Sequence, residues 1–471
     1  MKKIISIILF GILFLSGICA GSYNYKNTTE IKNTMMLTDY DMVIIAPEKF
    51  SSSVQPLIDH KNSHGILTFI KTTEEIYDEY EGRDKAEQIK YFIKDAIEQY
   101  NISYVLLVGG RIGQLFNWYV PVRYSNVNDG NLHKQFISDL YFADIYKEGG
   151  EFEDWDSNGN GIFAEWSSDS HSPGDVMDLK PDVAVGRLPC RYLGGVNTIV
   201  EKIIYYENNV YGQDWFNNIL LVGGDTNPNV GEPYPYEGEV CCEWILQYLE
   251  GFNATRLYTS DGTLTGPSDF LQAYNNGYGL VYYAGHGWQD KMGTYPPDGD
   301  EAIFFMHNEN IQQLNNKNKY PVMVVGCCVT TEFDVGKLNF LSVFNNLKKF
   351  NYFFNFIHEC IWECIGWNFV KKPDVGSIAY IGSTSTTWGA TGDKNNDSVP
   401  DGVQTGCTSG LCTEFFKIYG EDEDGFIGDI FRNTLVNVIE SFSAGSDRIQ
   451  CKCVQEYTLL GDPSLKIGGY S

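Results

Sequence analysis

The fold prediction depends on two stretches of sequence, Gly279-Leu-Val-Tyr-Tyr-Ala-Gly-His-Gly287 and Tyr320-Pro-Val-Met-Val-Val-Gly-Cys-Cys328. Each is a short apolar run, rich in Val and Tyr, that ends at glycine and a reactive side chain. Runs of this length are typical of strands buried on both faces, as in parallel sheets. Loops that leave the carboxyl ends of such strands gather at one edge of the sheet. If the two strands are neighbours, His286 and Cys328 meet there as a base and a nucleophile.

Each of these signals is weak when it is taken alone. A Gly-His-Gly triplet has no fixed meaning, and a cysteine that ends a buried strand is often a small apolar core residue. Both residues end similar strands, however, and the segment between them is long enough for a crossover connection. Two interpretations of His286 and Cys328 therefore stay open: a catalytic pair, or two residues packed in the core.

Length and composition limit the classes of protein. The chain has 471 residues, which favours two α/β units over one simple core. Its 31 Tyr and 28 Phe indicate a packed globular protein. A formal net charge of −27 disfavours nucleic acid or an anionic membrane as a partner. The charge is consistent with calcium binding or simply with solubility.

The amino terminus has the pattern of a secretory signal. Met1-Lys-Lys is followed by an apolar segment over residues 4–18, and Ala20 supplies a small residue before Gly21. We expect a signal peptide at residues 1–20 and a short linker or pro-segment at residues 21–39. No later stretch is apolar enough to span a membrane. The prediction is a secreted or cell-surface protein, with an uncleaved anchor as the alternative.

Strand and helix patterns alternate along the rest of the chain. Strands are predicted at residues 42–46, 66–71 and 104–108, and an amphipathic helix lies over residues 84–100. A second βαβ series begins at residue 218. The predicted class is α/β, with two doubly wound, mostly parallel sheets flanked by helices. We expect an N-terminal subdomain at residues 40–212 and a catalytic subdomain at residues 213–471.

One loop in the first half matches the calcium-loop pattern of alternating oxygen ligands. Hard oxygen ligands at alternate positions wrap one ion, and a glycine at position 6 permits the sharp turn. We expect a single structural Ca²⁺ there; the alternative is an acidic turn without an ion. The ligands would be Asp154, Asp156, Asn158, Asn160 through its backbone carbonyl, and Glu165.

A second oxygen-rich loop lies in the other half of the chain. It lacks the terminal Glu and the Gly spacing of the first loop, so a second Ca²⁺ and an ion-free turn are both open. The residues concerned are Asp393, Asn395, Asp397 and Asp401.

Of the chain's 12 cysteines, 11 remain if Cys19 leaves with the signal peptide, so one thiol at least is free outside the cell. Local disulfides are possible within Cys407/Cys412 and within Cys451/Cys453. Cys360 and Cys364 lie four residues apart, where packing or a disulfide is favoured over a zinc site.

The second half of the chain resembles the gingipain-like cysteine peptidases of the caspase-like fold group. The order and spacing of the matching segments agree over residues 218–467, and the first half also contains similar segments. The segments are Tyr283-Ala-Gly-His-Gly287, Val325-Gly-Cys-Cys-Val-Thr-Thr-Glu-Phe333, Gly376-Ser-Ile-Ala-Tyr-Ile-Gly-Ser-Thr384 and Tyr457-Thr-Leu-Leu-Gly-Asp-Pro-Ser-Leu465.

The resemblance implies roles for individual residues. His286 matches the catalytic histidine, Cys328 the nucleophile and Asp225 the third, acidic residue. The backbone N–H groups of Gly287 and Cys328 would hold the oxyanion. We also expect the imidazolium of His286 to favour the Cys328 thiolate, and Cys327 to point into the sheet.

Two further positions carry the implied substrate specificity. Trp388 matches a tryptophan that forms one wall of the specificity pocket. Glu239 falls where the arginine-specific members have an acidic residue that binds a basic substrate side chain. The segment at about residues 335–356 departs from the family pattern and looks inserted after the nucleophile.

The resemblance implies a secreted cysteine endopeptidase that acts on proteins or peptides, with a preference for cleavage after basic residues. Two alternatives stay open. One is a transpeptidase or sorting enzyme of the same family, in which an amine resolves the acyl-enzyme. The other is a non-catalytic, calcium-stabilised surface binding protein. The oligomeric state is open.

Overall fold

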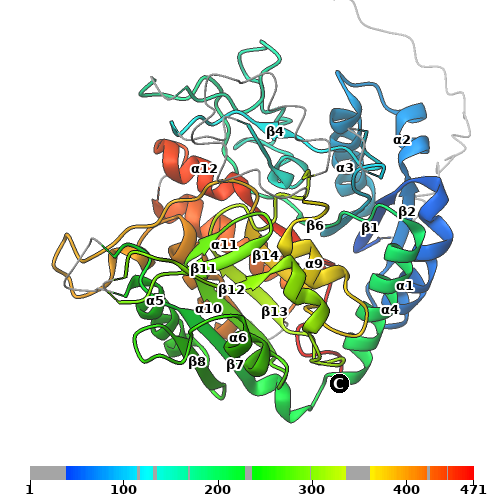
Figure 1. Cartoon of the computed structure of the whole chain (residues 1–471). Coiled ribbons are helices and arrows are strands. Elements are labelled where there is room, and N and C mark those ends of the chain that lie inside the picture. Colours follow the sequence, from blue (N-terminus) through cyan, green and yellow to red (C-terminus); the bar gives the residue numbers. More distant parts are fainter. Residues whose placement is uncertain are drawn as a thin grey trace, which may run out of the picture. The chain divides into compact units, whose positions relative to one another are not determined.

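The strands of both halves form one sheet in the computed structural model. It describes residues 39–471 other than 114–116, 131–134, 168–169, 229–235, 298, 336–360, 422–424 and 443. Within these residues the main sheet has ten strands, in the order β2-β1-β3-β6-β15-β14-β13-β9-β7-β8 (Figure 1). The predicted α/β class with a large, mostly parallel sheet flanked by helices is therefore confirmed.

The first four strands in this order come from residues 42–188 and the other six from residues 218–460. All neighbours run parallel except β14 and β15. Their bounds are β1 (Met42–Ala46), β2 (Thr68–Thr72), β3 (Tyr104–Val108), β6 (Ala184–Leu188), β7 (Asn218–Gly223), β8 (Asn253–Tyr258), β9 (Leu280–Ala284), β13 (Val322–Gly326), β14 (Ala379–Ser383) and β15 (Tyr457–Leu460).

Helices connect most of these strands. The Asp84 carboxylate caps α3 by accepting a hydrogen bond from the N–H of Glu87 at 3.0 Å, and Asn101 ends the helix with φ of 58°. The helices are α1 (Ser51–Ser63), α2 (Thr73–Glu79), α3 (Lys85–Tyr100), α4 (Leu193–Asn209), α5 (Glu237–Ile245), α6 (Pro267–Tyr274), α9 (Ile365–Lys371), α10 (Thr408–Glu421), α11 (Ile427–Phe442) and α12 (Arg448–Glu456).

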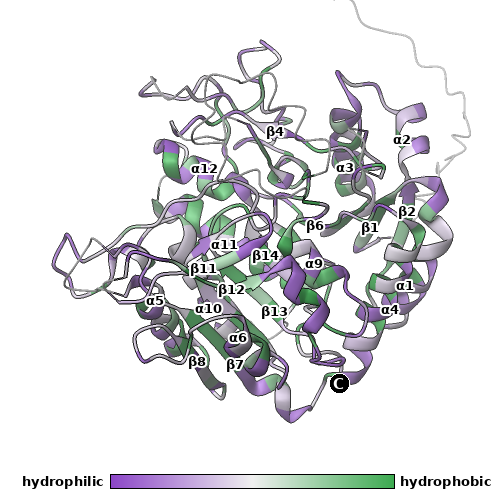
Figure 2. Cartoon of the chain, in the orientation of Figure 1, coloured by the Kyte–Doolittle hydropathy of each residue, from purple (hydrophilic) through white to green (hydrophobic). Residues whose placement is uncertain are grey.

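Both faces of the sheet are covered, which explains the continuous apolar strands. Neighbouring residues of a strand point to opposite faces. In β9, Tyr282 packs on Phe416 of α10, whereas Tyr283 packs on Phe305, which contacts Phe270 of α6. Figure 2 accordingly shows hydrophobic strands in green between helices with purple, hydrophilic stretches.

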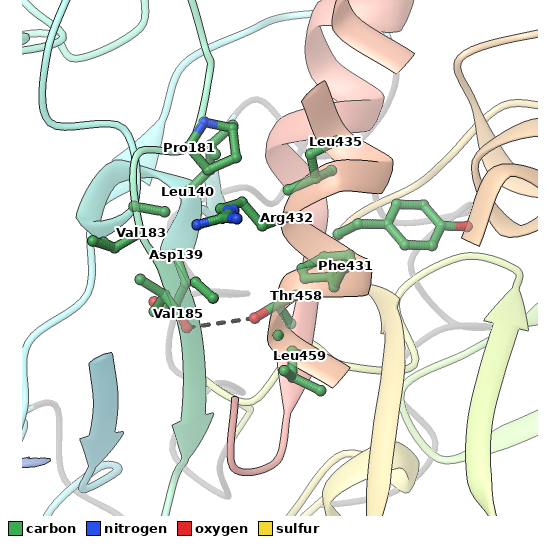
Figure 3. Close-up of a pocket in the computed structure, with 14 residues that line it drawn as sticks. Asp139, Leu140, Pro181, Val183, Val185, Phe431, Arg432, Leu435, Thr458 and Leu459 are labelled. Carbon is green, nitrogen blue, oxygen red and sulfur yellow. Dashed lines mark hydrogen bonds between the residues drawn. The ribbon is translucent and has the colours of Figure 1, made fainter. Parts of the chain in front are cut away.

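The prediction of two separate sheets is wrong, because the C-terminal strand joins them. β15 lies between β14 and β6, although only Leu460 and Arg187 pair across the junction with β6. The buried guanidinium of Arg187 donates to both oxygens of Asp139 at 2.7 Å. Thr458 of β15 donates to the same carboxylate at 3.4 Å, beside a cavity of about 20 Å³ (Figure 3). Polar contacts therefore hold the seam where strand pairing is sparse.

Two small antiparallel sheets complete the described strands. One consists of β10 (His286–Gly287), β11 (Lys291–Thr294) and β12 (Ile303–His307), and the other of β4 (Tyr124–Ser125) and β5 (Phe136–Ile137). None of the helices among the described residues has the length and apolar character needed to span a membrane. The predicted signal peptide, and the linker at residues 21–39 apart from its last residue, lie outside the described residues.

The local disulfides that the sequence left open within Cys407/Cys412 and within Cys451/Cys453 do not form, because Cys407 bonds to Cys453 instead. Cys407 precedes α10 and Cys453 lies on α12, with 5.2 Å between their Cα atoms. Cys451 and Cys453 share a helix two residues apart, so their side chains diverge. Cys412 and Cys451 are buried free thiols. Cys364 is also buried and free, whereas Cys360 lies outside the described residues.

Candidate active site

The two decisive strands are neighbours in the sheet. β9 and β13 run parallel in a register that pairs Ala284 with Gly326, so their carboxyl ends leave the sheet together. The N–H of Gly285 donates to the carbonyl of Gly326 at 3.1 Å and extends this alignment by one residue. His286 then begins β10, and Cys328 follows β13 by two residues. The predicted placement of both residues at one sheet edge is confirmed by this register.

Gly287 contacts the cysteine turn directly. A Cβ atom added to Gly287 would lie 2.3 Å from the carbonyl oxygen of Cys328 and 2.5 Å from Sγ of Cys327. No side chain fits at this distance, so only glycine allows the two loops to pack this closely.

The chain turns sharply after Cys328. Val329 has φ of 45°, a left-handed conformation that a β-branched residue rarely adopts. Its N–H donates to the carbonyl of Ser385 at 2.8 Å, and the N–H of Thr331 donates to that of Ser383 at 3.0 Å. These bonds to the loop after β14 hold the turn. As a result Cys327 is buried, as predicted, and Cys328 is half-buried.

The Cys328 thiol lies against the segment that follows β14. The backbone N–H of Thr387 donates to Sγ at 3.4 Å. Burial raises the pKa of the Cys328 thiol to about 11. The Thr387 N–H and the Lys452 charge lower this pKa, whereas the Glu456 and Asp129 charges raise it further. In the free protein, burial therefore outweighs the groups that stabilise the thiolate, and the Cys328 thiol is neutral near pH 7. This differs from the expected thiolate.

His286 is oriented by a backbone carbonyl. Its Nε2 atom lies 2.8 Å from the carbonyl oxygen of Thr226. A carbonyl only accepts hydrogen bonds, so Nε2 carries the proton and Nδ1 of the neutral ring keeps a lone pair. On the other side, the Tyr283 hydroxyl lies 2.8 Å from the carbonyl oxygen of His286 itself.

Asp225, the predicted acidic partner, lies just before Thr226 and is buried. Its carboxylate accepts a hydrogen bond from the N–H of Asn227 at 2.8 Å. Its backbone forms an antiparallel bridge with Tyr295, whose ring lies 5.6 Å from that of His286. The bond that orients His286 comes from Thr226, which sequence reasoning missed because a backbone carbonyl has no residue type.

Glu237, at the start of α5, was also missed. It is 6% exposed, and its Oε2 atom accepts hydrogen bonds from the N–H of Thr226 at 3.1 Å and from its hydroxyl at 2.9 Å. Its other oxygen, Oε1, has no hydrogen-bond partner among the described residues. Glu237 therefore fixes the residue that orients His286.

Glu239 lies two residues after Glu237 on α5, and its carboxylate accepts hydrogen bonds from the loop after β8. It accepts hydrogen bonds from the N–H of Ser260 at 2.9 Å and from the Ser260 hydroxyl at 2.5 Å. The side chain is 7% exposed, and burial raises the pKa of its carboxyl. These bonds fill much of the capacity that a substrate cation would use.

Trp388 lies one residue beyond the Thr387 contact with Cys328. Its indole Nε1 donates to Asp129 Oδ2 at 2.8 Å, while 39% of the residue stays exposed. Trp388 is therefore next in sequence to the residue that touches Cys328.

The first oxygen-rich loop folds onto itself. The N–H of Asn160 lies 2.9 Å from Asp156 Oδ1 and 3.0 Å from Asn158 Oδ1, and the Asn160 amide donates to Glu165 at 2.8 Å. Arg83 pairs with Asp156 at 2.6 Å. No group of three His, Cys, Asp or Glu side chains suited to a metal occurs in the described part of the chain. The oxygens of Asp156 and Asn158 thus both approach the backbone N–H of Asn160.

The second oxygen-rich loop is built similarly and is largely exposed. The Asp393 carboxylate accepts hydrogen bonds from the N–H groups of Asp397 at 3.1 Å and Ser398 at 2.9 Å. Asn395 Oδ1 accepts from the same Asp397 N–H at 3.1 Å, and Asp401 accepts from the N–H of Lys394 at 3.3 Å.

Comparisons with known proteins agree with the sequence resemblance. A model of peptidase family C25 matches residues 36–468. Gingipain R2 of Porphyromonas gingivalis is 21% identical over 433 residues, which cover 90% of this chain and 46% of the relative. An uncharacterized protein of Archaeoglobus fulgidus is 23% identical over 360 residues, 73% of this chain and 75% of that protein. The chain thus spans about half the length of the gingipain R2 relative.

Solved structures show the same fold. The Arg-specific cysteine proteinase gingipain R aligns with a TM-score of 0.61 at 19% identity, covering 91% of this chain and 78% of that one. A complex of the pro- and mature domains of the P. gingivalis protein RgpB aligns with a TM-score of 0.60 at 20% identity, covering 91% and 79%.

Proposed function

Because the chain belongs to peptidase family C25, we propose that it is a cysteine endopeptidase with Cys328 as nucleophile and His286 as acid–base. The observation that carries the proposal is the register of β9 and β13, which brings the two residues to one edge of the sheet. The contact of Gly287 with the Cys328 carbonyl supports it further. A histidine and a half-buried thiol at this edge form a nucleophile with its base.

The reaction starts from the neutral thiol. The proton of Sγ passes to Nδ1 of His286, and the sulfur attacks the scissile carbonyl carbon. The backbone N–H groups of Gly287 and Cys328 stabilise the oxyanion, each worth on the order of 10²–10³ in rate. His286 then donates the proton to the leaving amine, and water hydrolyses the acyl-enzyme.

The imidazolium formed in the first step needs a partner for its second N–H. We assign this role to the carbonyl of Thr226, 2.8 Å from Nε2. Asp225 adds negative charge one residue away and, through its backbone bridge to Tyr295, helps to fix the position of this carbonyl.

The proposed substrate is a protein or peptide with a basic residue before the cleaved bond. The Glu239 carboxylate near the start of α5 and the net charge of −27 support it, because carboxylates attract guanidinium and ammonium groups. Trp388 supplies the exposed aromatic wall. A library screen in which cleavage occurs mainly after apolar or acidic residues would remove Glu239 from this role.

We also propose secretion and structural calcium. The amino-terminal pattern supports export, and the converging oxygens of Asp156, Asn158 and Glu165 support an ion that would neutralise the loop. The ion would act by holding this loop of the fold. The loop at residues 393–401 is the second proposed site.

A cleavage assay tests the function. The purified protein is incubated with a peptide library, and the products are identified by mass spectrometry with and without an added amine. Cleavage that is lost in Cys328→Ala and kept in the matched control Cys327→Ala supports the proposal. An amine-linked product would identify a transpeptidase instead. Cleavage by Cys328→Ala, or no cleavage by the native protein, would contradict the nucleophile or the activity.

A further inference from the structure

A cluster of buried charges lies behind the nucleophile. The Lys452 ammonium on α12 lies 2.8 Å from Glu456 Oε2 and 3.3 Å from Asp129 Oδ2. The three side chains have no exposed surface. Charges at such depth persist only where they are paired and hydrogen-bonded, so the remaining contacts of this cluster indicate what it does.

Lys452 also binds the segment that touches Cys328. Its Nζ atom donates to the carbonyl oxygen of Thr386 and lies 3.4 Å from the Thr386 hydroxyl. The N–H of the same peptide group belongs to Thr387, and it donates to Cys328 Sγ at 3.4 Å. A cation on the carbonyl polarises the peptide and strengthens the N–H as a donor. One peptide group therefore connects the buried cation to the sulfur.

Asp129 connects the same cluster to the exposed tryptophan. Its Oδ2 atom, which pairs with Lys452, also accepts the hydrogen bond from the indole of Trp388 at 2.8 Å. The Thr386–Thr387 peptide against the sulfur and the indole of the next residue, Trp388, are thus held by one pair of charges, Lys452 and Asp129.

We propose that Lys452 is a positioning residue of the active site, which holds and polarises the Thr386–Thr387 peptide so that its N–H stabilises the Cys328 thiolate. Asp129 orients Trp388 at the substrate side of the same cluster. The role of Trp388 rests on the proposed peptidase function, whereas the effect on the thiol does not.

The charges around the sulfur determine whether each substitution should raise or lower the reactivity of Cys328. The charges that act on the Cys328 thiol are those of Lys452 and Glu456 on α12 and of Asp129, and the adjacent thiol is that of Cys327. His286 leaves the same edge of the sheet, at the start of β10. Lys452 lowers the pKa of the Cys328 thiol, and Glu456 raises it. Burial raises the pKa of Glu456 to about 7, so its charge appears only as the pH rises through neutrality. Removing the lysine and removing the glutamate charge should therefore act in opposite directions.

The test measures the alkylation rate of Cys328 in the full chain by iodoacetamide between pH 5.5 and 9.5. Fragment masses distinguish label on Cys328 from label on Cys327. We expect Cys328 in Lys452→Met to react about threefold to tenfold more slowly at neutral pH, because a smaller fraction of the thiol is ionised. The greater nucleophilicity of a thiolate with a higher pKa partly offsets this loss. Glu456→Gln should react about two- to threefold faster above pH 7 and at the native rate below pH 6, where the native carboxyl is protonated.

Lys202→Met is the matched control. Lys202 is also a buried lysine, and it donates to the backbone carbonyls of Val370, Lys372 and Val375. It should leave the alkylation profile unchanged even where it lowers the melting temperature. A native profile in Lys452→Met, or shifts of Lys452→Met and Glu456→Gln in the same direction, would overturn the proposal. If Lys452→Met does not fold, Glu456→Gln alone decides, and an unchanged rate above pH 7 overturns it.

The substrate side has its own variants. Trp388→Phe keeps a ring but removes the donor to Asp129, and Asp129→Asn keeps an acceptor for the indole. We expect Trp388→Phe to raise KM several-fold with kcat within about twofold, and Asp129→Asn to have the smaller effect on KM. Equal KM values in native protein and Trp388→Phe would overturn the role of Asp129. Alkylation shifts in a protein that cleaves no peptide would refute the peptidase proposal and leave the positioning role intact.

Discussion

Gly287→Ala is the sharpest test of the active-site geometry. The added methyl would lie 2.3 Å from the Cys328 carbonyl oxygen, 2.5 Å from Sγ of Cys327 and 2.9 Å from Cγ2 of Thr330. The nearest of these atoms belongs to the backbone, so no side-chain rotation relieves the contact. The loop of His286 and the turn of Cys328 must move apart, by about 1 Å to reach van der Waals distance.

Two magnitudes follow from this displacement. Overpacking of this kind costs about 1–3 kcal/mol of folding free energy. A shift of about 1 Å between reacting groups costs on the order of 10² in rate. We therefore expect Gly287→Ala to lower kcat/KM about a hundredfold, mainly through kcat, while the melting temperature falls by only a few degrees.

The assay compares cleavage kinetics and thermal melting with those of Gly194→Ala. A methyl at Gly194 would meet no atom within 4 Å, so this variant should match the native protein in kcat/KM. Native kinetics and native melting in Gly287→Ala would refute the contact between the two loops. A protein that melts far below the native temperature would instead place Gly287 in the core of the fold and not only between catalytic loops.

Other perturbations give expected outcomes as well. Cys327→Ala should keep activity and destabilise the fold by about 1–3 kcal/mol, measured by denaturant unfolding, whereas Cys328→Ala should lose activity alone. Lys61→Met should cost about 3–5 kcal/mol, because it leaves Glu207 and Asp462 buried without their cation, each at 2.8 Å in the native fold. Burial acts to raise the pKa of Glu207, but Lys61 and His60 hold this pKa below its ordinary value. The stabilisation from this ion pair is therefore present when the pH lies above the ordinary pKa of a glutamate, and it is lost as the pH falls through the lowered pKa. Glu165→Gln should weaken Ca²⁺ binding in calorimetry and reduce the drop in melting temperature caused by a chelator; no heat of binding and no chelator effect would refute the site. Glu237→Ala should lower kcat about tenfold, and Glu237→Gln, which keeps an oxygen acceptor for Thr226, less than threefold; equal losses would contradict the bonding of this residue to Thr226.

The neighbouring placement of β9 and β13 could be predicted because it depends on local patterns. Apolar runs that end in glycine identify buried parallel strands, and such strands expose their carboxyl ends together. Once the strands pair, His286 and Cys328 follow them at the same edge of the sheet. The same reasoning correctly assigned Cys327 to the interior, because neighbouring strand residues alternate.

The parts that could not be predicted depend on contacts between distant segments. β15 inserts between β14 and β6 and pairs with β6 through one residue pair only, supported by the seam around Asp139. No local pattern encodes that neighbour. The Cys407–Cys453 disulfide joins residues 46 positions apart, and its geometry exists only after α10 and α12 have packed. Glu239 was placed by similarity in a thinly matching region, and the serine and threonine that bind its carboxylate lie on a different loop.

The side chains that the sequence identifies at this site, His286 and Cys328, both form hydrogen bonds with backbone groups. His286 takes its orientation from the Thr226 carbonyl, and Cys328 takes its hydrogen bond from the Thr387 N–H, so backbone groups on opposite sides of the pair complete the chemistry. Each backbone group is in turn fixed by a buried charge, Glu237 on one side and Lys452 on the other. A backbone group cannot be changed directly by substitution. Substitutions of the two buried charges, Glu237 and Lys452, are therefore the way to perturb the proposed catalytic pair, and each can be made independently of the other.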